Sequence, residues 1–204
     1  MHKKNRKFIF PFFCLSVFLI LFLVNFFSTG FKIDYLISKN ISSLHKNNFN
    51  ELFIFLGHYA RVILIGLSVF FVSLLYLQKR KKKSLVLATS LILGLILEQV
   101  IKFFVQRERP LIQLVQEAGY SFPSGHAISS IILFSLLIYF YKNKIESYFF
   151  RIIFIFVNIF LILLVGFSRI YLNVHWLSDI IGGYALGLSI VYAVLIFYGI
   201  EIYK

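Results

Sequence analysis

Long apolar runs separated by shorter polar stretches divide the chain into six segments of roughly membrane-spanning length. The runs cover residues 8–27, 52–77, 84–104, 127–141, 152–167 and 180–200. A helix of about 20 apolar residues crosses the hydrocarbon core of a bilayer. Backbone groups inside a bilayer must find their hydrogen bonds within the segment, which favours helices. The pattern therefore predicts an all-α integral membrane protein with six transmembrane helices.

Three of the polar stretches between these runs are long enough to form structure outside the bilayer. In residues 28–51, apolar positions recur at helical spacing, which indicates either a helix lying on the membrane surface or a loop packed on the helix bundle. Residues 105–125 contain proline and glycine and are predicted to form a loop. Residues 168–178 separate the last two spans.

The positions of lysine and arginine predict the orientation of the spans. Thirteen of the 21 basic residues lie before the first span, in 79–83, in 142–151 or after the last span. The other eight lie on the opposite side, and four of these belong to 102–126 or 168–179. Short cytoplasmic loops carry the excess of basic residues. Both termini are therefore predicted to be cytoplasmic, and both 102–126 and 168–179 to lie at the extracytoplasmic ends of the helices.

Composition narrows the class of protein further. With 60% hydrophobic residues, 14% charged residues and a mean hydropathy of +0.87, the chain is interpreted as a single membrane-embedded domain over residues 1–204. The basic residues behind the net charge of +13 lie mostly in the loops and are interpreted as an orientation signal. No nucleic-acid partner is therefore predicted. The single cysteine, Cys14, excludes a disulfide and a cysteine-based metal site. The first apolar run is interpreted as a retained span, because the Phe-Ser-Thr-Gly that follows is a poor cleavage site.

Residues 168–179 place Arg169, His175 and Asp179 between two apolar runs. Ionisable groups are costly at that position, so a functional site is the first interpretation. His175 and Asp179 are four residues apart, and a helix beginning near His175 puts them on one face. The carboxylate then holds one ring nitrogen and leaves the other nucleophilic. The guanidinium of Arg169 suits a phosphate or a carboxylate.

Residues 102–126 add groups that suit a polyanionic substrate. Lys102 and Arg109 supply cations. The Pro-Ser-Gly-His sequence at 123–126 turns into the fourth span, where backbone N–H groups and the Ser124 hydroxyl form an anion site. His126 is placed to protonate a leaving oxygen. The two stretches together predict phosphoryl transfer through a histidine.

The three motifs resemble the signature of the type 2 phosphatidic acid phosphatase superfamily, in particular its bacterial membrane lipid phosphatases. They read Lys102-x6-Arg109-Pro110, Pro123-Ser124-Gly125-His126 and Ser168-Arg169-x5-His175-x3-Asp179. The resemblance implies that His175 attacks phosphorus, that Asp179 holds its ring, and that His126 protonates the leaving oxygen and later activates water. It implies no metal and no cofactor, and a phosphoryl-binding set made of Lys102, Arg109, Ser124, Gly125 and Arg169.

The resemblance also implies a phosphorylated lipid as substrate. Undecaprenyl diphosphate, phosphatidylglycerol phosphate, phosphatidic acid and lipid A phosphates are the candidates, with the phosphatidylglycerophosphatase and undecaprenyl-diphosphatase branch favoured. The expected location is a bacterial cytoplasmic (inner) membrane, with the site facing the periplasm or the exterior. The alternatives are a lipid phosphotransferase that uses the same phosphohistidine and a non-catalytic channel or transporter. A zinc site on the two histidines and the aspartate is the alternative to metal-free chemistry.

Three features beside the motifs carry structural expectations. Glu98 lies one turn before Lys102 and is predicted to pair with it. Arg107 is interpreted either as a substrate contact or as a purely electrostatic residue. The glycines between residues 182 and 187 allow close helix packing.

Four aromatic or charged residues and one asparagine are less informative. Tyr171 and Trp176 are predicted to be interfacial anchors. Asn173 is expected to tolerate a positive φ if the loop requires one. His58 and Arg61, at the outer end of the second span, are candidates for lining the pocket, and neither is assigned a role.

Overall fold

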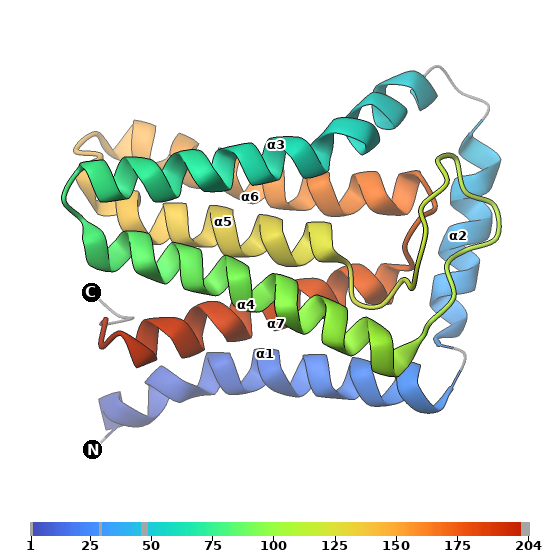
Figure 1. Ribbon diagram of the computed structural model, residues 1–204, viewed down its shortest axis with the longest axis horizontal. Helices are drawn as coiled ribbons and strands as arrows, with labels where there is room; N and C mark the ends of the chain where they lie inside the picture. The colour runs from blue at the N-terminus through green and yellow to red at the C-terminus, as the bar shows by residue number, and fades with distance from the viewer. Residues whose placement is uncertain (1, 29, 46–48, 201–204) are drawn as a thin grey trace.

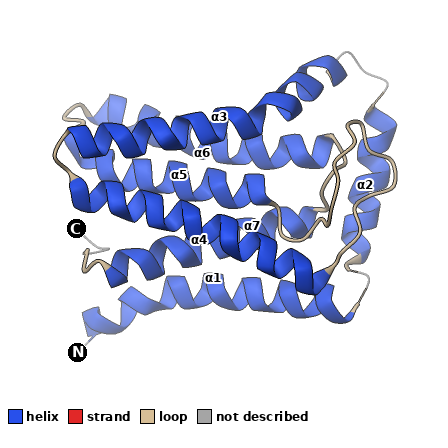
Figure 2. Cartoon of the chain, in the orientation of Figure 1, coloured by secondary structure: helices blue, strands red, loops and turns tan. Residues whose placement is uncertain are grey.

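The computed structural model describes residues 2–28, 30–45 and 49–200. Within these residues the chain forms helices and no strand (Figures 1 and 2). The helices are α1 (His2–Phe27), α2 (Lys32–Leu44), α3 (Asn50–Leu77), α4 (Lys81–Val105), α5 (Gly125–Tyr141), the 3₁₀ helix η1 (Lys142–Lys144), α6 (Tyr148–Tyr171) and α7 (Leu177–Phe197). Of the described helices, six are long and apolar enough to cross a membrane, and α2 is not among them. The predicted all-α architecture with six membrane-spanning helices is confirmed.

Helix boundaries differ from the predicted spans at both sides of the second motif segment. Helix α6 continues to Tyr171, so Ser168 and Arg169 lie in its last turn rather than in a loop. Helix α7 begins at Leu177, three residues before the apolar run at 180. Polar residues extend these helices because their side chains find partners on other segments, which hydropathy along the chain does not record. Between the first two spans, the helical alternative holds, since α2 occupies most of that stretch.

Helix α5 is at the centre of the bundle and is largely buried, as is α7. It packs against α3, α4, α6 and α7, and α1 packs against the outer side of α7 (Figure 1). The close approach of α5 and α7 depends on small residues, because a Cβ at Gly183 would crowd Ala127 and the Ser124 carbonyl. The expected packing role of these glycines is confirmed.

The two motif segments meet at one end of the bundle. In Figure 1 the start of α1 and the end of α7 lie at the left, and the loop between α4 and α5, the α6–α7 connection and α2 lie at the right. Helix α2 runs crosswise over that right-hand end rather than along the bundle. Residues 102–126 and 168–179 can therefore build one site.

Candidate active site

The central pair of the site is His175 and Asp179. His175 precedes the first turn of α7, and its Nδ1 lies 3.4 Å from Asp179 Oδ2. The same Asp179 oxygen accepts the Trp176 backbone N–H at 2.9 Å, which fixes the carboxylate at the helix N-terminus. Both side chains are buried, with 2% and 0% of their surface exposed. The predicted pairing is present, although the carboxylate reaches back from the helix instead of sharing a helical face with the histidine.

The second ring nitrogen of His175 points to a cation. Its Nε2 lies 3.3 Å from Arg109 Nη1, which also donates to the Val174 carbonyl at 2.7 Å. Burial lowers the pKa of His175 below its ordinary value, and the hydrogen bond with Asp179 acts in the opposite direction. The ring is therefore neutral at pH 7. With Nδ1–H donated to Asp179, the lone pair on Nε2 is the nucleophilic one.

The Pro-Ser-Gly-His turn leads into α5 beside this pair. Ser124 precedes the helix, and its backbone N–H donates to the Asp179 carbonyl at 3.2 Å. Ser124 Oγ, His126 Nε2 and Arg169 Nη2 are buried and have no hydrogen-bond partner among the described residues. Buried polar atoms normally have partners, so three such atoms from two of the motifs indicate a site for a polar ligand. A helix N-terminus favours an anion there.

Lys102 and Gly125 are joined by Glu98. Lys102 Nζ donates to Glu98 Oε1 at 2.6 Å, which confirms the predicted pair. The Glu98 carboxylate packs against Gly125, and a Cβ at that position would overlap it. The two motifs thus approach through an ion pair that leaves no room for a side chain at residue 125.

Glu117, which the motif pattern did not single out, bridges the two arginines of the site. Its two carboxylate oxygens lie 3.3 Å from Arg109 Nη1 and 3.3 Å from Arg169 Nη1. The guanidinium of Arg169 is fully buried, whereas 23% of the Glu117 side chain is exposed. Together with Glu98 on Lys102, this carboxylate neutralises cations that the sequence assigns to phosphate binding.

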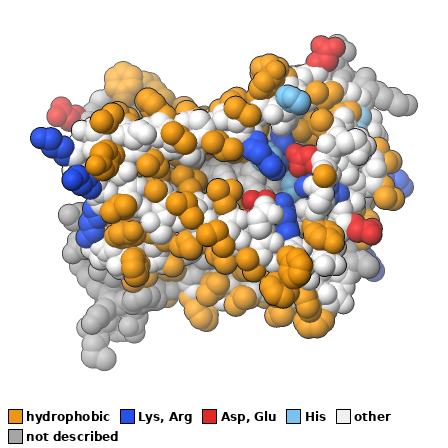
Figure 3. Space-filling model, viewed as in Figure 1, with side chains coloured by type: hydrophobic (Ala, Val, Ile, Leu, Met, Phe, Trp, Pro, Cys, Tyr) orange, Lys and Arg blue, Asp and Glu red, His pale blue; other side chains and the backbone are white. Residues whose placement is uncertain are grey.

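A cavity of about 450 Å³ runs between α3 and α4 to the turn at 123–126. Its walls are mostly apolar side chains of α3 and α4, and Glu98, Gly125 and His126 lie at its polar end. Arg61 also lines it and interacts electrostatically with His126, Arg109 and Arg169. Figure 3 shows charged and histidine side chains around a hollow in an otherwise largely apolar face. Arg61 is thus a residue of the site, which the sequence offered as a pocket-lining candidate without assigning it a role.

The contacts of Arg107 and Tyr171 define roles that the sequence left open or predicted differently. Arg107 does not line the cavity between α3 and α4, and its guanidinium pairs with Asp34 and Asp179, which favours the electrostatic alternative over a substrate contact. Tyr171 is not an interfacial anchor, because it is buried and its ring stacks on Phe53 with 4.1 Å between centroids.

The residues that follow Tyr171 also hold the connection to α7. Trp176 is half-buried and donates its Nε1–H to the Glu108 carbonyl at 2.9 Å, so it holds the loop that contains Glu108. Asn173 has a φ of +54°, as expected for asparagine in a tight turn. Its side-chain amide donates to the Ile112 carbonyl at 2.7 Å. Sequence neighbours of His175 therefore pack inward and fix the segment that carries it.

The zinc alternative has no ligand set in the described part of the chain. No group of three His, Cys, Asp or Glu side chains there is arranged to hold a metal ion. His175 Nδ1 is engaged by Asp179 and its Nε2 faces a guanidinium.

Comparison with known families agrees with this geometry. The model of the PAP2 superfamily matches residues 83–202, which include both motif segments. The chain belongs to the PAP2 superfamily. The family resemblance seen in the three motifs is confirmed.

Relatives within the PAP2 superfamily are known by sequence and by structure. Phosphatidylglycerophosphatase B of Bacillus subtilis (strain 168) is 34% identical over 102 residues, which is 48% of this chain and half the length of that protein. Undecaprenyl-diphosphatase of Sulfolobus acidocaldarius is 27% identical over 172 residues, 78% of this chain and 74% of that protein.

Two crystal structures share the fold. A transmembrane PAP2 type phosphatidylglycerolphosphate phosphatase from Bacillus subtilis superimposes with a TM-score of 0.82 and 26% identity, covering 96% of this chain and 99% of that one. LpxE from Aquifex aeolicus gives a TM-score of 0.62 at 23% identity over 81% of this chain and 96% of its own, a likeness of fold alone.

Proposed function

We propose that this protein is a metal-independent membrane lipid phosphatase that acts through a phosphohistidine on His175. The observation that carries the proposal is the cavity between α3 and α4, with apolar walls and with His126 and Gly125 at its polar end. Such a cavity holds a lipid chain along its walls and its phosphate at the end. Membership of the PAP2 superfamily supports the same reaction class.

The geometry supports a two-step displacement. His175 Nε2 attacks phosphorus, and a P–N bond forms as the P–O bond to the lipid breaks. His126 gives its proton to the leaving oxygen, then takes a proton from the water that attacks phosphohistidine and releases inorganic phosphate. Asp179 holds the His175 ring and stabilises the positive charge that develops on it.

The phosphoryl-binding set proposed for this reaction surrounds the unpartnered polar atoms. Lys102, Arg109 and Arg169 supply positive charge, and Ser124 and the Gly125 N–H supply donors at the start of α5. Neutralising the equatorial oxygens and positioning the phosphorus is most of what phosphoryl transfer requires. The lipid part of the substrate then extends toward the apolar cavity.

We place the site on the extracytoplasmic side of a bacterial cytoplasmic membrane, with residues 1–204 as one domain. Support comes from the bias of thirteen basic residues against four outside the motifs on the opposite side. The start of α1 and the end of α7 also lie at the end of the bundle opposite the site (Figure 1). This arrangement supports a topology with both termini in the cytoplasm and the site toward the periplasm or the exterior.

The names of the relatives favour phosphatidylglycerol phosphate or undecaprenyl diphosphate as substrate. A diphosphate leaves a charged lipid phosphate after hydrolysis, and Arg61 is a cation in the cavity next to His126. Lipid A phosphates and phosphatidic acid are further candidate substrates. A phosphotransferase shares every catalytic residue with this proposal and is separated from it by the product.

Phosphate release by the purified protein in detergent tests the proposed function. We expect release from at least one of undecaprenyl diphosphate, phosphatidylglycerol phosphate, phosphatidic acid and lipid A phosphate, at the same rate with and without EDTA. The substrate with the highest kcat/KM then identifies the lipid. A phosphorylated acceptor lipid with little free phosphate contradicts hydrolysis and favours the transferase. Activity that EDTA abolishes contradicts a metal-independent mechanism.

Glu117→Gln is expected to strengthen inhibition by inorganic phosphate or vanadate, lowering the inhibition constant about tenfold. The carboxylate bridges Arg109 and Arg169, and a phosphate oxygen must compete with it for the same guanidinium groups. Removing its charge leaves the cations free for product, so phosphate also dissociates more slowly. Steady-state inhibition of the wild type and the variant measures the change.

The matched control for Glu117 is Glu108→Gln, an exposed carboxylate of the same loop. It makes the same change in net charge and is expected to leave the inhibition constant within about twofold. Equal tightening in both variants would mean that only the overall field of the loop changed. Weaker inhibition in Glu117→Gln would show that the carboxylate organises the arginines rather than competing with the phosphate.

A further inference from the structure

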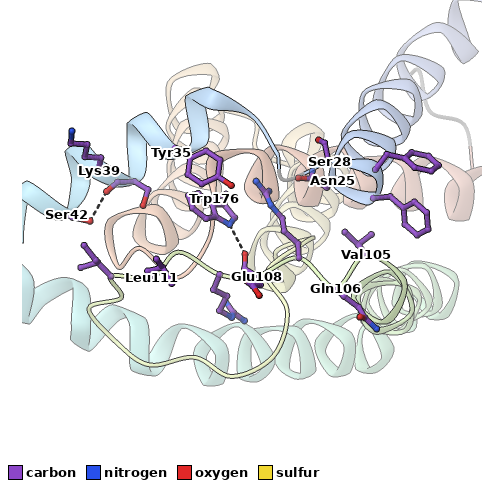
Figure 4. A pocket seen from close by; sticks show the side chains of 16 residues that line it. Asn25, Ser28, Tyr35, Lys39, Ser42, Val105, Gln106, Glu108, Leu111 and Trp176 are labelled. Atoms are coloured by element: carbon purple, nitrogen blue, oxygen red, sulfur yellow. Dashed lines mark hydrogen bonds between the residues drawn. The ribbon is translucent and has the colours of Figure 1, made fainter.

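Helix α2 is attached to the segment that carries His175. Four contacts connect them, and each joins a side chain of α2 or its C-cap to residues 171–178. They are Asp34 with Ser178, Tyr35 with Trp176 (4.8 Å between ring centroids), Ser42 with Asn173 (3.0 Å) and His45 with the Tyr171 carbonyl (2.7 Å). Beside them a cavity of about 800 Å³ opens between α2 and residues 105–112 (Figure 4). The helix therefore holds the nucleophile-bearing segment along its length.

Asp34 is the most buried of these contacts, with 1% of its surface exposed. Its Oδ1 accepts the Ser178 backbone N–H at 2.9 Å. Its Oδ2 accepts the Ser178 hydroxyl at 2.6 Å and Arg107 Nη2 at 2.8 Å. An ionised carboxylate is costly to bury unless it is paired and hydrogen-bonded, and here both conditions are met.

Arg107 connects Asp34 to the pair at the centre of the site. Its Nη1 donates to Asp179 Oδ1 at 2.5 Å and to the Ser178 hydroxyl at 2.7 Å. The guanidinium also lies 5.4 Å from the centre of the Trp176 ring. Because Asp179 Oδ2 faces His175 Nδ1, the ionic groups form one chain: Asp34, Arg107, Asp179, His175.

We propose that Asp34 and Arg107 are positioning residues of the phosphatase site, which act through Asp179 to orient His175 and to set the charge that faces its ring. Neither residue touches the reacting atoms. The inference rests on the proposed function, in that it takes His175 as the nucleophile. It also gives α2 a role in catalysis, since this helix supplies the carboxylate at the far end of the chain.

The two residues have opposite electrostatic effects on His175. The guanidinium withdraws negative charge from Asp179 and makes it a weaker acceptor for the imidazole N–H. The Asp34 carboxylate takes part of the guanidinium charge and so leaves Asp179 the stronger acceptor. Removing Arg107 therefore favours protonated His175, and removing the charge of Asp34 disfavours it.

Other charged groups face His175 from the elements packed around it and stay the same in these variants. They are Asp179 of α7, Arg109 of the loop, Lys102 of α4 and His126 of α5. Because these groups are constant, a difference between the two variants reports on the chain from Asp34 to Asp179. Burial already lowers the pKa of His175, so the acid limb of the wild-type activity profile lies below the ordinary histidine pKa.

The dependence of kcat/KM on pH in Arg107→Gln and Asp34→Asn tests the inference, because it reports the ionisation of groups in the free enzyme. We expect the acid limb to move to higher pH in Arg107→Gln and to lower pH in Asp34→Asn, each by about one pH unit. At its own optimum each variant is expected to lose about 10- to 100-fold in kcat, the loss typical when a residue that orients a catalytic group is removed. KM stays within about twofold, because neither side chain binds the phosphate.

Three further variants keep the test decisive if these buried substitutions prevent folding. Arg107→Lys keeps the charge without the two-armed geometry, and Ser178→Ala removes hydrogen bonds without changing any charge. Both are expected to lower kcat and to leave the acid limb in place. Arg151→Gln makes the same substitution as Arg107→Gln in an arginine that bonds only the α5–α6 connection among the described residues, and it is expected to match the wild type.

Two outcomes overturn the inference. Acid limbs that move in the same direction in Arg107→Gln and Asp34→Asn contradict opposed charges on Asp179. Unchanged kcat in Arg107→Lys and Ser178→Ala shows that the contacts are structural only. Either result leaves the proposed function intact, whereas full activity in His175→Ala removes the proposed function and the inference together.

Discussion

His175→Ala is expected to lower phosphate release from every lipid substrate by roughly 10⁴-fold or more, the loss seen when a covalent nucleophile is removed. The side chain supplies the Nε2 lone pair, which lies beside Arg109 while Nδ1 is held by Asp179. Binding is expected to persist, because the cations and the start of α5 remain. Phosphate release under saturating substrate measures the loss in kcat.

Trapping of the phosphoenzyme distinguishes this role from a structural one. Wild-type protein quenched during turnover of a radiolabelled substrate is expected to carry acid-labile, alkali-stable phosphate, and His175→Ala to carry none. His58→Ala is the matched control, since His58 is exposed on α3 and is not part of the His175–Asp179 pair. Label that remains in His175→Ala would place the covalent intermediate on another residue.

His126→Gln is expected to lower kcat by roughly 10²- to 10⁴-fold, because glutamine keeps the size and hydrogen-bonding capacity of the side chain but cannot transfer a proton. In the wild type, His126 Nε2 is buried without a partner among the described residues, next to the start of α5. That position is suited to the leaving oxygen in the first step and to water in the second. Rates with natural lipids measure the combined effect on both steps.

A substrate with a better leaving group distinguishes the two roles of His126, protonation of the leaving oxygen and activation of water. With p-nitrophenyl phosphate the departing oxygen needs no proton, so His126→Gln is expected to form phosphohistidine rapidly and to hydrolyse it slowly. A burst of nitrophenol and an accumulated phosphoenzyme are the expected signs. Equal losses for lipid and nitrophenyl substrates, with no burst, would mean that His126 only shapes the site. The unfolding temperature in detergent confirms that the variant is folded.

Much of the fold could be predicted because each membrane-spanning helix requires a long apolar run, which is visible in the sequence. A bilayer imposes the same length and apolarity on every span, so six runs predicted six helices. Helix ends were less accurate where polar residues continue a helix, as Ser168 and Arg169 do at the end of α6. Arg169 finds its partners on other segments, such as Glu117, and this information is absent from local hydropathy.

Some residues of the candidate site could also be predicted from the sequence, and others could not. Sequence motifs identified His175, Asp179 and the Pro-Ser-Gly-His turn. Residues of these types at these spacings along the chain are typical of one reaction site. The partners of these residues could not be predicted, since Asp34, Arg61 and Glu117 come from separate segments with no motif of their own. Arg107 illustrates the limit, because its position in a motif favoured neither of two roles and its contacts selected one.

The sequence by itself determined the class of protein, the number of spans, the family and the candidate residues for the chemistry. These properties depend on composition and on the spacing of residues close together in the chain, and both can be read directly from the sequence. Only the tertiary structure decided which carboxylate neutralises which cation, and that α2 lies across the end of the bundle with Asp34 buried against Ser178 and Arg107. A charged side chain can be buried only where an oppositely charged or hydrogen-bonding group lies beside it. Whether such a group is there depends on how the helices pack.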